Sequence, residues 1–486
     1  MVENTLKYSI WDKKNWDTKS DFKIIWEKLF TQSLPMFFTS YSKRSGKKTN
    51  SPKTYRIQKT NWNKFWIKQL QLGTFKILKN DLKNGITIFE ENIISSKLGR
   101  KTWHEALMYR FLGWSYLVYG NLTLAKYFFE LSSMIFDFYP DKKIASIESL
   151  KSQFFIIRCN IIQGNLAKAS DLAEELLLKS KNGASYNFEA FLFIEMGNIY
   201  FQMGEFEVAY LYYEKSYNFF DSLENIDEKI TLGLKMGKIF IARNDIDQAL
   251  KVFDKFMNGL TNSSYLTNIY DFIIFFADSG YLSQALDLYY RRIRKIKFKL
   301  LVNQLDLLDQ FDLIEAELLK KSNQLKDKVK AIQILEQLVN SSYLPFEKQV
   351  LALYNLCELH IIEAKISDNN FEAIQKIEVI NNKIFNLGKK YSLYSHIIYS
   401  KLISTQLSVL RGDLNKSYTF LNEALEISRD NGLNKLEERI EIEKEQLITI
   451  VKDRRKLAPF ERKIKDLELQ RYISEALFDY HSEMSM

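Results

Sequence analysis

Three stretches of this chain follow the same pattern and align without gaps: RFLGWSYLVYGNLTLAKYFFELS (residues 110–132), IEMGNIYFQMGEFEVAYLYYEKS (194–216) and LKMGKIFIARNDIDQALKVFDKF (234–256). In each stretch, a glycine is followed by an aromatic residue three positions later and by an alanine twelve positions later. A second aromatic residue follows the alanine by four positions. Because spacings of three and four keep side chains on one helical face, we predict two antiparallel helices in each unit. The Gly- or Asn-containing turn between the halves supports this division.

The repeated positions predict where the two helices touch. Small side chains are expected where the backbones approach most closely, and the large aromatic side chains are expected to fill the next layer. The small residues are Gly113, Gly197, Gly237, Ala125, Ala209 and Ala249. The aromatic residues are Tyr116, Tyr200, Phe240, Phe129, Tyr213 and Phe253, and we predict that all six belong to the core.

Weaker copies extend the pattern in both directions. The second small-residue position recurs at Gly85, Ala125, Ala169, Ala209, Ala249, Ala285, Ala331, Ala373 and Ser417, on average about every 41 residues. The pattern resembles the tetratricopeptide repeat (TPR), which has the same small and aromatic offsets but a usual period of about 34 residues. The resemblance covers residues ~65–430 and is loose after residue 300. It implies an all-α, right-handed superhelical α-solenoid of about eight or nine TPR-like helix pairs.

Composition divides the chain further. We expect a basic, aromatic-rich N-terminal segment at residues 1–60, well-matched repeats at 61–300, degenerate repeats at 301–432 and C-terminal capping helices at 433–486. The five prolines fall in the N-terminal segment or between helical patterns, so none interrupts a predicted helix. The charged C-terminal helices favour a polar cap, with a dimerising or partner-binding helix as the alternative.

Several protein classes are excluded by composition. Apolar residues make up 46% of the chain and charged residues 27%, which allows a packed core and excludes general disorder. Two cysteines are too few for a disulfide framework, and this favours a reducing compartment. We find neither a signal peptide nor an apolar run of membrane-spanning length in the sequence. We therefore expect a cytoplasmic protein.

The net charge of +9 is concentrated near the N-terminus. Residues 1–100 carry 20 Lys and Arg against 8 Asp and Glu, and no acidic residue lies between Glu27 and Asp81. Basic residues with interleaved aromatics suit contacts to phosphates and bases or to an acidic protein. The candidate contact residues are Lys43, Arg44, Lys47, Lys48, Lys53 and Arg56. The alternative is a solvated segment that reflects the general Lys, Asn and Ile bias of the chain.

Signatures of catalysis or of metal and cofactor binding are nearly absent. Cys357 and His360 lie about one helical turn apart, but a metal would need further ligands, so we predict a buried cysteine beside a surface histidine. Residues 45–49, SGKKT, imitate the end of a phosphate-binding loop but lack its first glycine and a preceding strand. We therefore predict no enzyme activity, no metal and no cofactor.

The resemblance to TPR proteins implies a binding groove along the first helix of each pair. Its positions lie six and three residues before the repeat glycine and one and four residues after it. The candidate peptide-binding residues at these offsets are Arg110, Trp114, Lys151, Phe154, Arg158, Phe191, Asn198, Phe201, Lys238 and Tyr270. Cations beside aromatic and apolar residues suit a partner segment with acidic and apolar side chains. The alternative is that these side chains make ordinary contacts between helices.

These observations favour a noncatalytic scaffold or adaptor that binds a protein or peptide in the groove. Two alternatives stay open. One is a ligand- or peptide-responsive TPR regulator of signalling or transcription, and the other is nucleic-acid association through the basic N-terminal segment. The sequence does not match the carboxylate clamp of chaperone-binding TPR domains, because Ile194 stands where the clamp has lysine.

Overall fold

The structure is a computed structural model. It describes residues 61–445, apart from gaps at 79–80, 100–101, 141, 182–185, 223–225, 258–265, 295–304, 342–343, 345, 367–370, 392, 432 and 434–435. Two compact units divide the chain, Met1–Gln58 and Lys59–Met486, and all described residues belong to the second.

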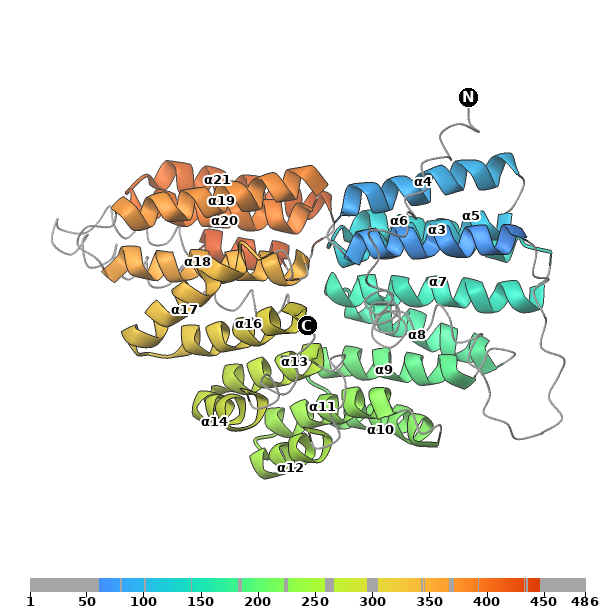
Figure 1. The fold of residues 1–486 in the computed structure, drawn as a ribbon, viewed down its shortest axis with the longest axis horizontal. Helices are drawn as coiled ribbons and strands as arrows, with labels where there is room; N and C mark the ends of the chain where they lie inside the picture. Colours follow the sequence, from blue (N-terminus) through green and yellow to red (C-terminus); the bar gives the residue numbers. More distant parts are fainter. Residues whose placement is uncertain are drawn as a thin grey trace. The chain divides into compact units, whose positions relative to one another are not determined.

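The described residues form eighteen α-helices in nine consecutive pairs, followed by a helical segment at residues 436–445, and contain no strand (Figure 1). The first helices are α3 (Asn61–Leu78), α5 (Thr102–Val118), α7 (Lys142–Ile162), α9 (Tyr186–Gln202), α11 (Ile226–Ala242), α13 (Leu266–Phe276), α16 (Leu305–Lys321), α18 (Phe346–Ile366) and α20 (Tyr394–Leu410). The second helices are α4 (Leu82–Leu98), α6 (Leu122–Asp137), α8 (Leu166–Lys181), α10 (Phe206–Ser222), α12 (Ile246–Met257), α14 (Leu282–Leu288), α17 (Leu325–Leu338), α19 (Phe371–Tyr391) and α21 (Leu414–Asp430). The turn Ala277–Tyr281 joins α13 to α14, and the π-helical turn Tyr289–Ile293 extends α14.

Each pair is closed by a short turn with a recurring geometry. The central residue of the turn has positive φ in six pairs, at Gly120, Gly164, Gly204, Asn244, Gly280 and Gly412. Glycine suits this conformation because it has no Cβ. The residue that follows can then cap the second helix: the Asn121 side chain accepts a hydrogen bond from the Leu124 backbone N–H, and Asp413 accepts one from Lys416. The repeated Gly-Asn and Gly-Asp dipeptides therefore both end one helix and start the next.

Small residues lie at the closest contacts between paired helices, as predicted. A Cβ added at Gly113 would lie 2.9 Å from Phe129 and 3.0 Å from the Ala125 carbonyl oxygen. A Cβ at Gly197 would lie 2.4 Å from Tyr213. The alanines of the pattern, from Ala125 to Ala331, are fully buried. At Gly113 and Gly197 the pattern therefore reflects close approach within a pair, whereas a Cβ at Gly237 would lie 2.7 Å from Phe272 of the next pair.

The aromatic prediction is confirmed for one set and is wrong for the other. Phe129, Tyr213 and Phe253 are at most 2% exposed. Tyr116, Tyr200 and Phe240 are only half-buried. Tyr116 stacks on Phe128 at 5.5 Å, and Tyr200 stacks on Tyr212 at 5.5 Å, so each ring packs against its neighbour with one side left open.

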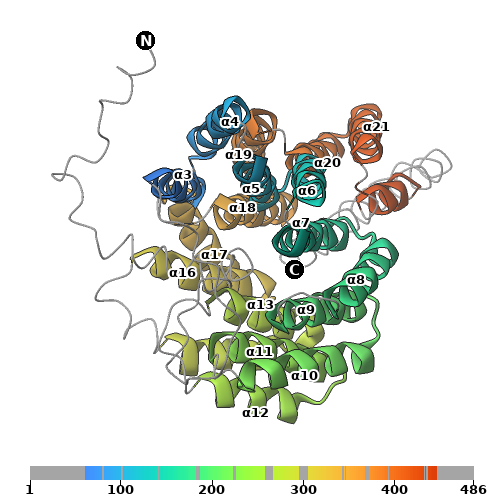
Figure 2. The same ribbon diagram turned by 90° about the vertical axis from the view of Figure 1, so that its right-hand side faces the viewer.

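Neighbouring pairs pack in sequence order. The first helices also contact each other along the chain, as α5 does with α7, α7 with α9, α11 with α13, and α16 with α18 (Figure 2). Pairs α16–α17, α18–α19 and α20–α21 continue this arrangement although the motif decays after residue 300. The described part is thus an all-α array of TPR-like helix pairs, as predicted. No helix among the described residues combines the length and apolarity that a membrane span requires.

The C-terminal prediction is covered only in part. Residues 436–445 are helical, and Leu436 and Ile440 are buried. The remainder of the predicted capping helices lies outside the described residues, so the choice between a cap and a partner-binding helix stays a prediction.

Candidate functional site: the first-helix surface of α7, α9, α11 and α13

The ten predicted groove residues all lie on first helices, but they differ in exposure. Six are buried: Arg110, Trp114, Lys151, Phe154, Phe191 and Tyr270. Four are half-buried: Arg158, Asn198, Phe201 and Lys238. The four half-buried residues come from three consecutive first helices, α7, α9 and α11. They are the part of the predicted set that a partner can reach without rearranging the helices.

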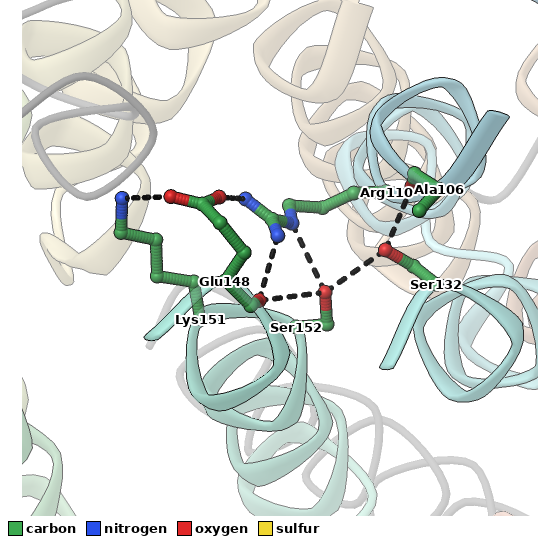
Figure 3. A network of polar contacts seen from close by, with 6 residues as sticks. All are labelled: Ala106, Arg110, Ser132, Glu148, Lys151 and Ser152. Carbon is green, nitrogen blue, oxygen red and sulfur yellow. Dashed lines mark hydrogen bonds and ion pairs between the residues drawn. The ribbon is translucent and has the colours of Figure 1, made fainter. Parts of the chain in front are cut away.

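Arg110 lies at the centre of a buried network between α5 and α7 (Figure 3). Its Nη1 donates to Glu148 Oε2 at 2.6 Å, and its Nη2 donates to the Glu148 backbone oxygen at 2.6 Å. Its Nε donates to Ser152 Oγ at 3.0 Å. The guanidinium is fully buried and lies 5.0 Å from the Phe136 ring centroid. Because its hydrogen bonds are made within the chain, Arg110 links the pair that contains α5 to the pair that contains α7. Its guanidinium is therefore not available to a partner.

Lys151 belongs to the same network. Its Nζ lies 2.7 Å from Glu148 Oε1, so the Glu148 carboxylate is held between two cations. Burial alone would raise the pKa of Glu148, but the charges of Lys151 and Arg110 lower it overall. For Arg110, these contacts are what the alternative of ordinary interhelical packing predicts, whereas Lys151 is paired with an acid on its own helix.

A second network joins α7, α9 and α11. Arg158 Nε donates to Glu195 Oε1 at 2.7 Å, and Asn198 Nδ2 donates to Glu195 Oε2 at 2.9 Å. Asn198 Oδ1 accepts hydrogen bonds from Tyr213 at 2.9 Å and from Lys235 at 2.8 Å. The Asn198 amide is therefore largely used within the chain. The Arg158 side chain keeps 39% of its surface exposed and can still meet a partner.

Lys238 has a different environment. Its Nζ lies 5.5 Å from the Phe201 ring centroid and 4.9 Å from that of Phe275, in cation–π geometry with both. Burial lowers the pKa of Lys238 to about 8, although the nearby Asp271 acts in the opposite direction. An anion placed beside this ammonium would stabilise its charged form. We call Arg158, Phe201, Lys235, Lys238 and Phe275 the α7–α13 surface.

Tyr270 lies in a third network, between α13, α16 and α18. Its hydroxyl donates to Glu317 Oε1 at 2.5 Å, and Asn355 donates to the same oxygen at 2.9 Å. Lys320 then bridges Asn355 and Glu358, with Nζ 2.7 Å from Glu358 Oε2. Because these groups are buried, the network fixes the register of successive first helices.

Sequence reasoning missed the acidic partners of the predicted groove residues. Glu148, Glu195 and Glu317 are all at most 9% exposed and lie on first helices. Glu195 stands two positions before the repeat glycine, and Asp271 stands two positions before Ile273, which replaces it. This offset was outside the groove positions that the TPR resemblance supplied. An acidic residue at that offset, in a helix otherwise rich in apolar residues, was the sequence feature that could have identified these partners.

The remaining candidates are placed as follows. The basic residues Lys43, Arg44, Lys47, Lys48, Lys53 and Arg56 lie outside the described residues. Cys357 is buried as predicted, but His360 is also buried, at 2% exposure, so its predicted surface position is wrong. The His360 side chain packs inside the array, and its Nδ1 lies 2.8 Å from Glu363, which is exposed. Within the described ranges, no cluster of three or more His, Cys, Asp and Glu could hold a metal ion.

Comparisons with known proteins add little to this geometry. No protein-family model matches the chain, and no curated protein has significant sequence similarity to it. Among solved structures, the chain is similar to the crystal structure of the P58(IPK) TPR domain, with 13% identity over 79% of this chain and 98% of that chain. It is also similar to a circular tandem repeat protein, with 11% identity over 86% of this chain and 95% of that chain. The TM-score is 0.20 in both cases. The contacts within and between its pairs give the chain the architecture of a TPR-like helical-repeat protein.

Proposed function

We propose that this protein is a noncatalytic interaction scaffold that binds a protein or peptide segment on the α7–α13 surface. The observation that carries the proposal is the Lys238 ammonium held between the half-buried rings of Phe201 and Phe275. An ammonium beside apolar rings suits a segment in which an acidic side chain stands next to an apolar one.

The surrounding charges support this partner chemistry. Lys235 and Lys238 lie one helical turn apart on α11, and Arg158 exposes part of its side chain on α7. Glu195 is already held by Arg158 and Asn198, and it is 3% exposed. An incoming carboxylate therefore meets Arg158 and Lys235 near an acid that already has its own partners, and it meets Lys238 near Asp271.

The proposal is tested with an array of peptides that vary independently in acidic and apolar content. The intact chain is expected to bind peptides that combine both, and Lys238→Glu is expected to weaken that binding at least tenfold, because it replaces attraction by repulsion. Phe201→Ala should also weaken binding, by removal of one ring contact.

The matched control is Lys251→Glu, an exposed lysine on the second helix α12 of the same pair. It makes the same change in net charge away from the α7–α13 surface. Equal loss of peptide binding in Lys238→Glu and Lys251→Glu would show that only net charge matters and would refute the assigned surface. Circular dichroism of each variant verifies that the helices are intact.

A further inference from the structure

The turn between α5 and α6 contacts helices that come much later in the chain. The Tyr119 ring centroid lies 4.5 Å from that of Phe346, at the start of α18, and 5.7 Å from that of Tyr391, at the end of α19. Thr123 Oγ1 lies 3.5 Å from the backbone oxygen of Asn431, 308 positions further along the chain. Both views show the turn-bearing ends of α5 and α6 next to α19 and α20 (Figures 1 and 2).

These contacts are well packed. Tyr119 is 2% exposed, and its hydroxyl donates to the Ile77 carbonyl oxygen at 3.2 Å, so it also holds α3. Phe346 continues the cluster, with its ring 5.7 Å from Tyr391 and stacked on His396 at 6.3 Å. We call Tyr119 and Thr123, together with Phe346, Tyr391 and Asn431, the closing contact.

Tyr119 does not belong to the repeat pattern. It stands just before the positive-φ residue of its turn, and the equivalent residues of other pairs are Gln163, Met203, Arg243, Ser279 and Arg411. None of these is aromatic, and Met203 is 40% exposed. Packing within a pair therefore does not require a large ring at this position, and the Tyr119 ring packs against Phe346 and Tyr391, outside its own pair.

Linear repeat arrays have contacts only between neighbouring units. We propose that the closing contact joins the early pairs to the late pairs, so that the array is held in one closed arrangement. The separation between early and late first helices is then set by Tyr119 and its partners as well as by neighbour packing. A partner that needs the first helices further apart must break this contact, which makes it a conformational control point.

The full chain and two variants test the proposal by small-angle X-ray scattering and hydrogen exchange. Tyr119→Ala removes the central ring, and Thr123→Arg places a long charged side chain against Asn431 at the exposed edge of the closing contact. Both variants are expected to increase the radius of gyration by several per cent. Both should speed exchange in α18 and α20 at least tenfold, while far-UV circular dichroism stays that of a helical chain.

The controls change equivalent positions in other pairs. Met203→Ala matches Tyr119→Ala, and Asp247→Arg matches Thr123→Arg because Asp247 holds the same place at the start of α12. If Tyr119→Ala does not fold, Thr123→Arg alone tests the proposal. Thr123 is exposed and lies outside the core, so its replacement is expected to leave the helices folded. The proposal is overturned when folded Thr123→Arg keeps the scattering curve and the α18 and α20 exchange rates of the unmodified chain. It is also overturned when Asp247→Arg changes both measurements as much as Thr123→Arg does.

Discussion

At the scale of single residues, Arg110 acts as a structural cation. It was predicted as a groove residue, yet its guanidinium donates hydrogen bonds to Glu148 and Ser152 within the chain. Replacing it would leave a buried carboxylate with Lys151 as its remaining cation. Charge changes at Arg110 therefore report on stability, whereas changes at Lys238 test the proposed binding surface.

Arg110→Met is expected to lower the free energy of unfolding by about 3 kcal/mol. Removing one member of a buried ion pair leaves the other charge, the Glu148 carboxylate, desolvated without that partner. Arg411→Met is the matched control: Arg411 pairs with Glu378, but the two side chains are 49% and 41% exposed. Its loss should cost less than about 1 kcal/mol. Urea unfolding measures both values, and equal costs would contradict the structural role of Arg110.

Gly197 provides a second prediction at this scale. Exchanging glycine for alanine inside a helix ordinarily stabilises it by about 1 kcal/mol. At Gly197 the new Cβ would lie 2.4 Å from the Tyr213 ring. Gly197→Ala is therefore expected to destabilise the protein by about 1–3 kcal/mol, through overpacking. A higher melting temperature for this variant would show that α9 and α10 are further apart than described.

At the scale of elements, α20 carries a buried histidine that makes stability depend on pH. His396 lies between the Phe346 and Tyr354 rings, and burial lowers its pKa to about 4. In the unfolded chain a histidine pKa is about 6.5, so the unfolded state takes up the proton first as pH falls. Stability is thus lost between about pH 6.5 and pH 4, by about 1.4 kcal/mol for each pH unit.

His396→Gln removes this dependence. Between pH 7 and pH 5, the unmodified chain is expected to lose about 2 kcal/mol more stability than the variant does. Other groups titrate in the same range: burial raises the pKa of Glu443 to about 7, which favours the folded state as pH falls. Comparing the two chains at each pH by urea unfolding cancels such contributions. An identical pH dependence in both chains would place His396 in contact with solvent.

At the scale of the whole molecule, the closing contact predicts cooperative unfolding. Trp114 is the last of the seven tryptophans, so tryptophan fluorescence reports on the early part of the chain, whereas circular dichroism reports on all helices. The two thermal transitions are expected to coincide in the unmodified chain. In Tyr119→Ala they should separate by several degrees, because early pairs then depend only on their neighbours. Tyr119→Phe, which keeps the ring, should behave as the unmodified chain; separation there as well would contradict the role of the ring.

The sequence by itself determined the helix pairs. Glycine and alanine at fixed offsets mark where two backbones approach, and Gly-Asn or Gly-Asp turns end one helix and cap the next. Both signals are local, since they act within about 25 residues, and they identified the pairs α5–α6, α9–α10 and α11–α12 directly. The burial of Ala125, Ala209 and Ala249 confirms this interpretation.

Only the tertiary structure decided what each first helix presents to a partner. The acids that neutralise Arg110 and Arg158 come from the next helix pair, 38 and 37 positions away, where the repeat offsets gave no indication of them. The partners of Tyr119 lie even further along the chain, in α18 and α19. Local patterns specify helices and turns because those depend on near neighbours. The pairing of buried charges and the closing contact depend on side chains from different helix pairs. These side chains meet only when the pairs pack together.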